Sequence, residues 1–276
     1  MKLFITGANG QLGQELTLLA KAAGHEVLAY SSKALDITQS DLADLSGVDY
    51  LVNCAAYTAV DKAEDEPEKA FAVNAMGVAN LAKTCAEYNV PMIHISTDYV
   101  FDGTKKAAYL ETDTPNPQGV YGGSKLAGEA LLQATWDKHI ILRVSWVFGR
   151  FGNNFVKTIT RLSQERDQLK IVADQHGSPT GASHIAKVIL ALLAHPQLTS
   201  HWGIYHYTDA PQTTWYDFAK SFVDPEKCTL VPITTAEYPV KAKRPSNSVL
   251  SCDRINKIFG ICQCSWQEEL QDMYAV

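Results

Sequence analysis

The segment Tyr121-Gly122-Gly123-Ser124-Lys125 places a phenol and an amine four residues apart. On a helix this spacing brings both side chains to one face, so the lysine ammonium can favour the ionised form of the tyrosine. An unperturbed phenol has a pKa of about 10, and lowering that pKa would let it exchange a proton near neutral pH. The pair predicts a general acid or base, although the same spacing also occurs by chance on amphipathic surface helices.

Three glycines near the start of the chain, Gly7, Gly10 and Gly13, form a Gly-x-x-Gly-x-x-Gly turn. The turn lies between a predicted strand over residues 2–6 and a helix beginning near Gln11, which is the setting of a dinucleotide-binding turn. Without Cβ atoms the backbone can approach a pyrophosphate, whose charge then meets the free amides at the helix N-terminus. The spacing differs from the Gly-x-Gly-x-x-Gly fingerprint, and a purely structural turn is the alternative.

The end of the second predicted strand bears on the choice of dinucleotide. It reads Tyr30-Ser31-Ser32-Lys33, with hydroxyls and a cation where an acidic residue would bind the adenosine ribose and repel a 2′-phosphate. We therefore expect NADPH to be preferred. NADH is possible as well, because Asp36 lies a few residues further on and can compete for the adenosine.

A hydroxyl and a carboxylate, Thr97 and Asp98, follow the fourth predicted strand. The carboxyl ends of parallel strands form the ligand-binding edge of an α/β sheet. The position of these two side chains therefore predicts that they belong to the same site as the cofactor.

Short apolar runs alternate with helical patterns in the first half of the chain, which indicates successive βα units. Strands are predicted over residues 2–6, 26–30, 50–53, 91–96 and 140–144, and helices from about residue 11, over 66–89 and over 119–136. The right-handed crossover rule arranges such units as a Rossmann-like, doubly wound parallel sheet. The predicted fold class is therefore α/β.

After residue 150 the alternation weakens and turn residues become denser. Shorter elements are predicted around residues 154–165, 183–194 and 214–222. We expect a dinucleotide-binding Rossmann domain over residues 1–150 and mainly a smaller C-terminal substrate-binding lobe over 151–276. The helix at 183–194 is a segment that can pack back on the Rossmann domain.

The composition excludes several classes of protein. The 276 residues are 46% apolar and 20% charged, as in an ordinary globular protein, and a net charge of -6 without a basic block argues against nucleic-acid binding. No apolar run approaches the roughly 18 residues of a membrane span, and none near the N-terminus fits a signal peptide, so we expect no membrane partner and a cytoplasmic location. The six cysteines and eight histidines lack metal-ligand spacing, which predicts no metal site.

Six further segments, together with these motifs, give the whole chain a resemblance to the extended short-chain dehydrogenase/reductase family. They are AAYTAVDKAE (55–64), STDYVFDG (96–103), SWVFG (145–149), GNNF (152–155), DQHGSPT (174–180) and RPSNS (244–248). They are most similar to members that reduce a nucleotide-linked deoxyhexose. The resemblance implies reduction by NAD(P)H of the C4 ketone of dTDP-4-dehydro-L-rhamnose to dTDP-L-rhamnose, by a monomer or homodimer.

The resemblance also implies residue roles. Tyr121 would give the proton, Thr97 would bind the ketone oxygen, and Lys125 would hold the nicotinamide ribose and favour ionised Tyr121. Expected cofactor contacts, besides Tyr121 and Lys125, are Gly7, Gly10, Gln11, Leu12, Gly13, Ser31, Asp36, Ile37, Ala56, Tyr57 and Thr58. Expected substrate contacts are Thr97, Asp98, Tyr121, Trp146, Asn154, Arg244 and Asn247. Asn74 is expected to brace a helix and the active-site loop.

Some members are dimers bridged by Mg²⁺ through acidic side chains, and Glu15, Glu268 and Glu269 are candidates here. Solvated surface carboxylates are the alternative, so Mg²⁺ is not predicted.

Two other functions stay open at this stage. One is a non-catalytic dinucleotide-binding regulator, like the regulatory subunit related to methionine adenosyltransferase, and the intact Thr97, Tyr121 and Lys125 favour an enzyme over it. The other is a different nucleotide-sugar reductase or epimerase, since a fold is shared by many activities. The segments around Trp146 and Arg244 disfavour that second alternative.

Overall fold

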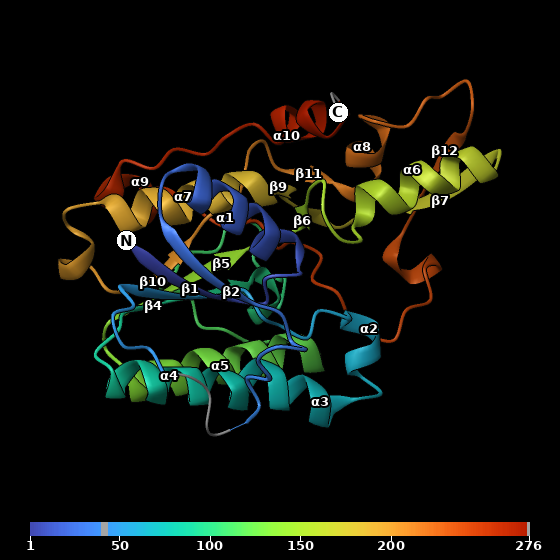
Figure 1. The fold of residues 1–276 in the computed structure, drawn as a ribbon. Helices are drawn as coiled ribbons and strands as arrows, with labels where there is room; N and C mark the ends of the chain where they lie inside the picture. Colours follow the sequence, from blue (N-terminus) through green and yellow to red (C-terminus); the bar gives the residue numbers. More distant parts are fainter. Residues whose placement is uncertain (40–43, 275–276) are drawn as a thin grey trace.

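The computed structural model describes residues 1–39 and 44–274 and has a parallel six-stranded sheet at its centre (Figure 1). The strand order is β10-β5-β4-β3-β1-β2, and every neighbouring pair is parallel. The strands are β1 (Lys2–Thr6), β2 (Glu26–Tyr30), β3 (Tyr50–Asn53), β4 (Met92–Thr97), β5 (His139–Val144) and β10 (Gly203–His206). The order reverses beside β1, and this is where α/β sheets bind ligands. The predicted α/β fold is confirmed.

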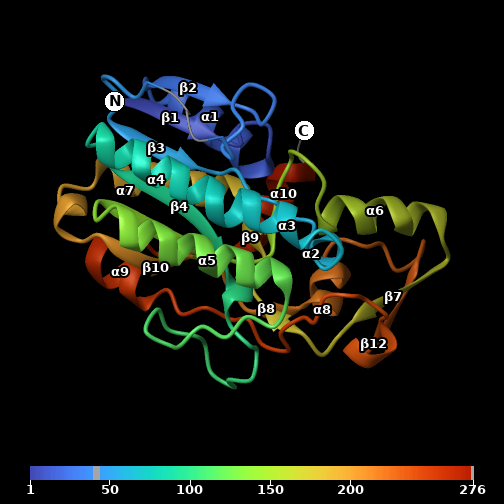
Figure 2. The ribbon, with the colours of Figure 1, turned by 90° about the horizontal axis from the view of Figure 1, so that it is seen from below.

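Helices cover both faces of the sheet (Figures 1 and 2). Helices α1 (Gln11–Ala22) and α7 (Ala182–Ala194) lie on one face, and α4 (Gly77–Glu87) and α5 (Val120–Thr135) on the other. Side chains alternate along a strand, so Leu3 and Ile5 of β1 join the apolar cluster of α1 and α7, while Phe4 joins that of α4. The strands are nearly continuous apolar runs because both faces of the sheet are buried.

The helix predicted over residues 66–89 is present from Pro67 to Glu87, but its middle is a π-helix. The chain forms α3 (Pro67–Phe71), a π-helix at Ala72–Met76 and then α4, following the short α2 (Val60–Ala63). A π-turn inserts one extra residue and is common at functional sites. The apolar pattern continues through it, so periodicity alone did not reveal the interruption.

The sixth strand, β10, was not predicted. It has four residues and pairs with β5 at the edge of the sheet. Helix α7 also lies after residue 150 and packs against α1. The predicted division between residues 1–150 and 151–276 stays a prediction. Helix α7 and strand β10 follow residue 150 in the sequence but belong with the central sheet.

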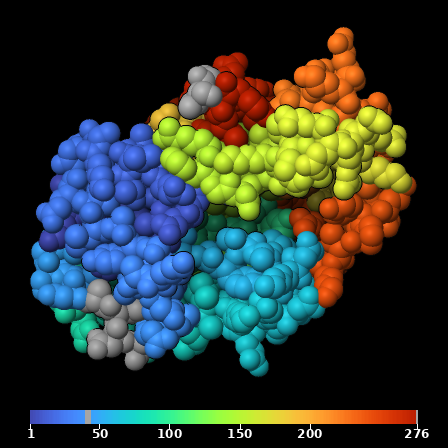
Figure 3. Space-filling model, turned by 45° about the vertical axis from the view of Figure 1, so that its right-hand side comes forward, coloured from blue at the N-terminus to red at the C-terminus, as the bar shows by residue number. Residues whose placement is uncertain are grey.

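A separate group of elements lies beside the sheet, at the right of Figure 1. It contains α6 (Phe155–Glu165), β7 (Gln168–Val172), α8 (Trp215–Lys220) and β12 (Thr229–Ile233), which share an apolar cluster. The remaining elements are β6 (Val147–Phe148), β8 (His176–Gly177), β9 (Thr180–Gly181), β11 (Thr213–Thr214), α9 (Asp253–Phe259) and α10 (Trp266–Tyr274). Figure 3 shows a hollow between the N-terminal segments and α6, with the green middle of the chain at its floor.

No helix in the described part of the chain is long and apolar enough to cross a membrane. The cysteines are free thiols.

Candidate active site

The glycine turn between β1 and α1 forms a cradle that side chains would fill. Gly7 has a φ of +67°, and a Cβ on it would lie 2.5 Å from the backbone nitrogen of Ala55. A Cβ on Gly13 would lie 2.3 Å from the carbonyl oxygen of Gly7. Gly10 precedes α1, and no side chain caps the first amides of the helix at Gln11 and Leu12. The turn therefore fits a pyrophosphate, which would accept hydrogen bonds from these amides.

The predicted adenosine contacts lie after β2. Ser31 directly follows the strand, and Asp36 is exposed, with its carboxylate accepting hydrogen bonds from the Thr38 amide (3.0 Å) and hydroxyl (2.8 Å). These two bonds lower the pKa of Asp36. Ile37 is different, because its side chain is 4% exposed and packs in the apolar cluster under α4. This packing therefore closes the Ile37 side chain off from a ligand.

The loop carrying Ala56, Tyr57 and Thr58 is held by the π-helix. The Asn74 side chain accepts a hydrogen bond from the Tyr57 amide (2.8 Å) and donates to the Tyr57 carbonyl (3.0 Å) and the Ser124 hydroxyl (3.0 Å). Asn74 thereby ties the loop to α5, and its predicted bracing role is confirmed.

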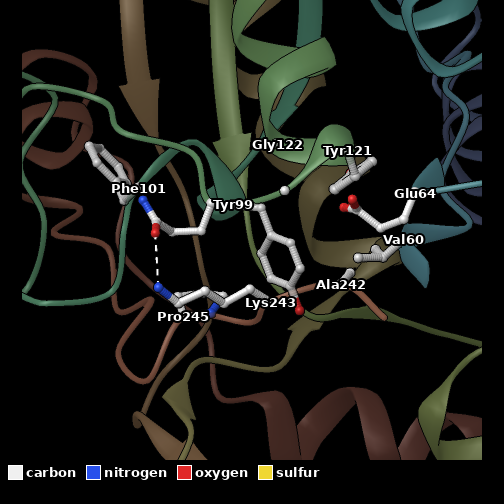
Figure 4. Close-up of a pocket in the computed structure, with 11 residues that line it drawn as sticks. Val60, Glu64, Tyr99, Phe101, Tyr121, Gly122, Ala242, Lys243 and Pro245 are labelled. Carbon is white, nitrogen blue, oxygen red and sulfur yellow. Dashed lines mark hydrogen bonds between the residues drawn. The ribbon is translucent and has the colours of Figure 1, made fainter. Parts of the chain in front are cut away.

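Tyr121 lies in the first turn of α5, at a pocket shared by segments far apart in the sequence (Figure 4). Glu64 accepts a hydrogen bond from the Val120 amide (2.8 Å) and so fixes the start of this helix. The Tyr99 ring meets the Tyr121 ring edge-on, with centroids 5.8 Å apart. Lys243, from near the C-terminus, lines the opposite side of the pocket.

The expected lowering of the pKa of Tyr121 is not found. Burial, Asp98 and Tyr99 raise this pKa, and only the hydrogen bond with Thr97 lowers it. The phenol therefore keeps its proton at neutral pH, as a general acid requires. The spacing predicted the shared helix face correctly but not the direction in which the flexible lysine side chain extends.

Lys125 is buried behind the site, at 2% exposure. Its Nζ donates a hydrogen bond to the Ile95 carbonyl (2.6 Å) and lies 3.4 Å from Nε2 of His94. Burial lowers the pKa of Lys125 to about 8, against the opposing charge of Glu129. Lys125 thus interacts with β4.

Thr97 and Asp98 lie together at the carboxyl end of β4. The Thr97 hydroxyl donates to Oδ1 of Asp98 (3.0 Å) and accepts from the Tyr99 amide (3.2 Å). Asp98 is 2% exposed, and within residues 1–39 and 44–274 its Oδ2 has no hydrogen-bond partner. Burial raises the pKa of Asp98 to about 7, against the effect of the nearby Ser248 and Thr97 hydroxyls. An unpaired buried acceptor is a candidate to bind a ligand.

The Asp98→Asn variant tests this raised pKa. Folded Asp98 holds its proton up to about pH 7, whereas the unfolded residue loses it near its ordinary value of 3.8. The wild-type protein therefore loses stability as the pH rises from about 4 to 7, and the variant lacks that loss. Between pH 5 and 8 we expect the variant to gain about 2 kcal/mol relative to the wild type in urea unfolding. Parallel pH curves for the two proteins would contradict the assignment.

Trp146 is held in an unusual backbone conformation. Its φ is +45°, and its indole stacks on Trp215 with ring centroids 3.6 Å apart. A Cβ on Gly177 would lie 2.4 Å from the Trp146 indole, so glycine is needed beneath the ring. No sequence motif pointed to Trp215 as the partner of Trp146, because Trp215 lies in a different element, α8.

The other predicted substrate residues are already bonded within the chain. Arg244 donates to the Asp61 carboxylate (2.7 Å), while its buried Nε has no partner in the described residues. Asn247 donates to the Lys105 carbonyl (2.7 Å). Asn154 caps α6 and donates to the Gln11 side chain (3.0 Å), so it lies beside the glycine turn. Asp61 was not predicted, and its place in the AAYTAVDKAE segment was the only available signal.

The candidate Mg²⁺ ligands do not form an open set of oxygen donors. Glu15 and Glu269 line a cavity of about 370 Å³ between α1, α7 and α10. Both Glu15 oxygens accept hydrogen bonds from Arg150 (2.8 and 2.9 Å), and Glu269 accepts one from Ser183. A paired carboxylate is a poor ligand for a cation that takes oxygen donors at about 2.0–2.1 Å. Glu15 and Glu269 are therefore already bonded within the chain.

The whole chain matches the RmlD substrate binding domain family, over residues 1–276. A dTDP-4-dehydrorhamnose reductase of Aggregatibacter actinomycetemcomitans is 46% identical, across 99% of this chain and 98% of that protein. A dTDP-4-dehydrorhamnose reductase of Sinorhizobium fredii is 42% identical, across 97% and 95%. The chain belongs to the dTDP-4-dehydrorhamnose reductase family.

Solved structures of dTDP-4-dehydrorhamnose reductases have the same fold. The enzyme of Clostridium acetobutylicum superposes with a TM-score of 0.92 at 38% identity, covering 100% of this chain and 99% of that one. The enzyme of Bacillus anthracis, solved in complex with NADP, gives a TM-score of 0.91 at 35% identity, covering 99% and 98%. The fold of this chain is thus the fold of these dTDP-4-dehydrorhamnose reductases.

Proposed function

We propose that this chain is an NADPH-dependent dTDP-4-dehydrorhamnose reductase. It reduces the C4 ketone of dTDP-4-dehydro-L-rhamnose to dTDP-L-rhamnose. The observation that carries this function is the full-length similarity to several reductases of that name, at 42 to 46% identity for the two above. The convergence of a protonated phenol, a hydroxyl and a buried carboxylate at the end of β4 supports it from the chemistry of the site.

Bound NADPH would supply the hydride that reduces the sugar ketone. Tyr121 donates a proton to the ketone oxygen as negative charge develops there, and its raised pKa keeps that proton available. Thr97 hydrogen-bonds the same oxygen. The unpaired oxygen of Asp98 accepts a hydrogen bond from a sugar hydroxyl, and the Trp146 ring, fixed by Trp215, offers a flat apolar surface to the hexose.

The nucleotide diphosphate is assigned to the basic segment near the C-terminus. The buried Nε of Arg244 has no partner among the described residues, its neighbours Lys243 and Pro245 line the pocket, and guanidinium geometry suits phosphate oxygens. Asn247 holds the backbone of residues 105 and 107, so we assign it to shaping the site. Asn154 is placed by its Gln11 contact closer to the cofactor turn than to the sugar.

The cofactor preference predicts a measurable ratio. The exposed Ser32 and Lys33 follow β2, and Asp36 is bonded to Thr38, which leaves a cation and hydroxyls for the 2′-phosphate. We expect kcat/KM for NADPH to exceed that for NADH by about tenfold or more, a difference of about 1.4 kcal/mol. Lys33→Ala should reduce the ratio, while Lys21→Ala, at the far end of α1, should not. A preference for NADH would contradict the assignment.

The reductase activity is tested directly with purified protein, enzymatically generated dTDP-4-dehydro-L-rhamnose and NADPH. The expected result is loss of NADPH absorbance with formation of dTDP-L-rhamnose. If the protein binds both NADPH and NADH but forms no product with either, the proposed function is refuted. Tight NADPH binding without turnover of this or another dTDP sugar would instead favour the regulatory-subunit alternative.

We assign the protein a nucleotide-sugar substrate, a cytoplasmic location and a monomeric or homodimeric state. Sedimentation of the purified chain distinguishes the last two. A different nucleotide-sugar reductase or epimerase shares the fold, as the dTDP-glucose 4,6-dehydratase of Streptomyces venezuelae does at 18% identity and a TM-score of 0.79. That similarity concerns the fold alone.

A further inference from the structure

Two buried polar residues lie behind Lys125 and have no role in the reaction described so far. They are Asn53, at the end of β3, and His94, within β4, and both are 0% exposed. Their side chains form a hydrogen-bonded row that ends at the lysine Nζ.

The orientation of the Asn53 amide is fixed by its neighbours. Its Oδ1 accepts a hydrogen bond from the Ala55 backbone amide (3.0 Å) and one from the Thr6 hydroxyl (2.6 Å). A backbone N–H can only donate, so the atom facing Ala55 must be the oxygen. The NH₂ group of Asn53 therefore faces His94.

This orientation determines the tautomer of His94. The Asn53 Nδ2 lies 3.0 Å from the His94 Nδ1, and an NH₂ group can only donate, so Nδ1 carries the lone pair. Burial of the ring holds the pKa of His94 well below its usual value. The ring is therefore neutral and has a single proton, which must lie on Nε2.

The proton on Nε2 points along the 3.4 Å separation to the Lys125 Nζ. An ammonium group has no lone pair, so two donors would face each other if Lys125 were charged. An amine removes the conflict, because it accepts from His94 while it still donates to the Ile95 carbonyl at 2.6 Å. We propose that Asn53 fixes His94 as the Nε2–H tautomer, and that His94 thereby disfavours the ammonium form of Lys125 relative to the neutral amine.

The other groups that face Lys125 do not supply a free counter-charge. Glu129, one turn later on α5, is bound by the Arg143 guanidinium (2.6 and 3.0 Å) and by the Ser96 hydroxyl. Cys54, following β3, is a neutral thiol because burial raises its pKa to about 12. Tyr121, one turn earlier on α5, is a protonated phenol with a raised pKa. The lowered pKa of Lys125, about 8, agrees with this arrangement.

Asn53 and His94 are thus positioning residues that act through Lys125. The importance of this rests on the proposed function, in which Lys125 binds the nicotinamide ribose. Ribose hydroxyls would give Lys125 new partners and release it from His94 and Ile95. The tautomer and the charge of Lys125 are properties of the free protein, so they are measured without substrate or cofactor.

The first test is nitrogen-15 NMR of the full chain, labelled in its histidines. Two-bond nitrogen–proton correlations distinguish a protonated from an unprotonated ring nitrogen, and the His94 signals are those lost in His94→Gln. The expected pattern is a protonated Nε2 and a bare Nδ1 at pH 7. A proton on Nδ1, or on both nitrogens, would overturn the proposal. Unchanged signals from the other histidines show that the variant is folded and that the missing signals belong to His94.

The second test follows the charge of Lys125 through its carbon-13 Cε shift as a function of pH. In His94→Gln the new amide can turn its oxygen to Lys125 and accept from an ammonium, so the titration midpoint should rise by about one pH unit or more. His139→Gln is the matched control, since His139 lies on β5 and bonds the Trp136 carbonyl instead. An unchanged midpoint in His94→Gln would refute the proposal. Absence of reductase activity, with both NMR results as expected, would refute the proposed function and leave this inference standing.

Discussion

Tyr121→Phe is expected to lower kcat by a factor of about 10² to 10⁴ while leaving NADPH affinity nearly unchanged. The substitution removes the only atom of the side chain that can give a proton, and it keeps the ring that packs edge-on against Tyr99. The pKa of this phenol is raised by burial, so the acid is present in its active form over the whole neutral range. Steady-state turnover at saturating substrate and NADPH binding by fluorescence give the two quantities.

Tyr205→Phe is the control for this experiment. Tyr205 is 0% exposed on β10, and its hydroxyl donates to the His201 carbonyl at 2.7 Å, remote from the sugar pocket in the sequence and in the fold. It should lose about 1 kcal/mol of stability for the missing hydrogen bond and keep its turnover. Near-normal activity of Tyr121→Phe would refute the role of Tyr121 as the proton donor.

Gly7→Ala is expected to abolish NADPH binding and to destabilise the protein by roughly 3 kcal/mol or more. Two effects add. The φ of +67° strains any residue with a Cβ, and that Cβ would lie 2.5 Å from the backbone nitrogen of Ala55, which cannot move without disturbing β3. Urea unfolding and NADPH titration measure the two consequences.

Gly24→Ala separates the two effects. Gly24 has a φ of +79°, but a Cβ there would meet nothing within 4 Å. This variant should lose only the strain energy, about 1 kcal/mol, and should bind NADPH normally. If both variants lose the same stability, the close approach of the glycine turn to Ala55 contributes nothing, and the argument for the cradle fails.

Local patterns predicted most of the sheet. The bounds of β1, β2 and β3 agree with the sequence expectation, and those of β4 and β5 lie within one residue of it, because buried parallel strands must be apolar on both faces. Strand β10 was not predicted because it is short and borders turns, and because it pairs with β5, whose residues are more than 60 positions away. Such an edge strand is created by tertiary structure more than by its own sequence.

The site was predictable where one motif carries one function. The glycine turn and the Tyr121–Lys125 spacing each encode a local geometry, and the structure has both. The direction of the Lys125 side chain was not predictable, because β4 supplies its partners, His94 and Ile95. The same limit applies to the Trp146–Trp215 stack and the Asp61–Arg244 pair, which join segments far apart in the sequence.

Because of the π-helix at Ala72–Met76, the active site depends on the number of residues in this segment. Removing one residue would let α3 and α4 join as one regular α-helix, because the π-turn accommodates one extra residue. Asn74 would then be displaced from Tyr57, while the apolar stripe of α4 could stay on the sheet. Substitutions are tolerated at exposed positions here, such as Met76. A single insertion or deletion, in contrast, would detach the cofactor loop from the core.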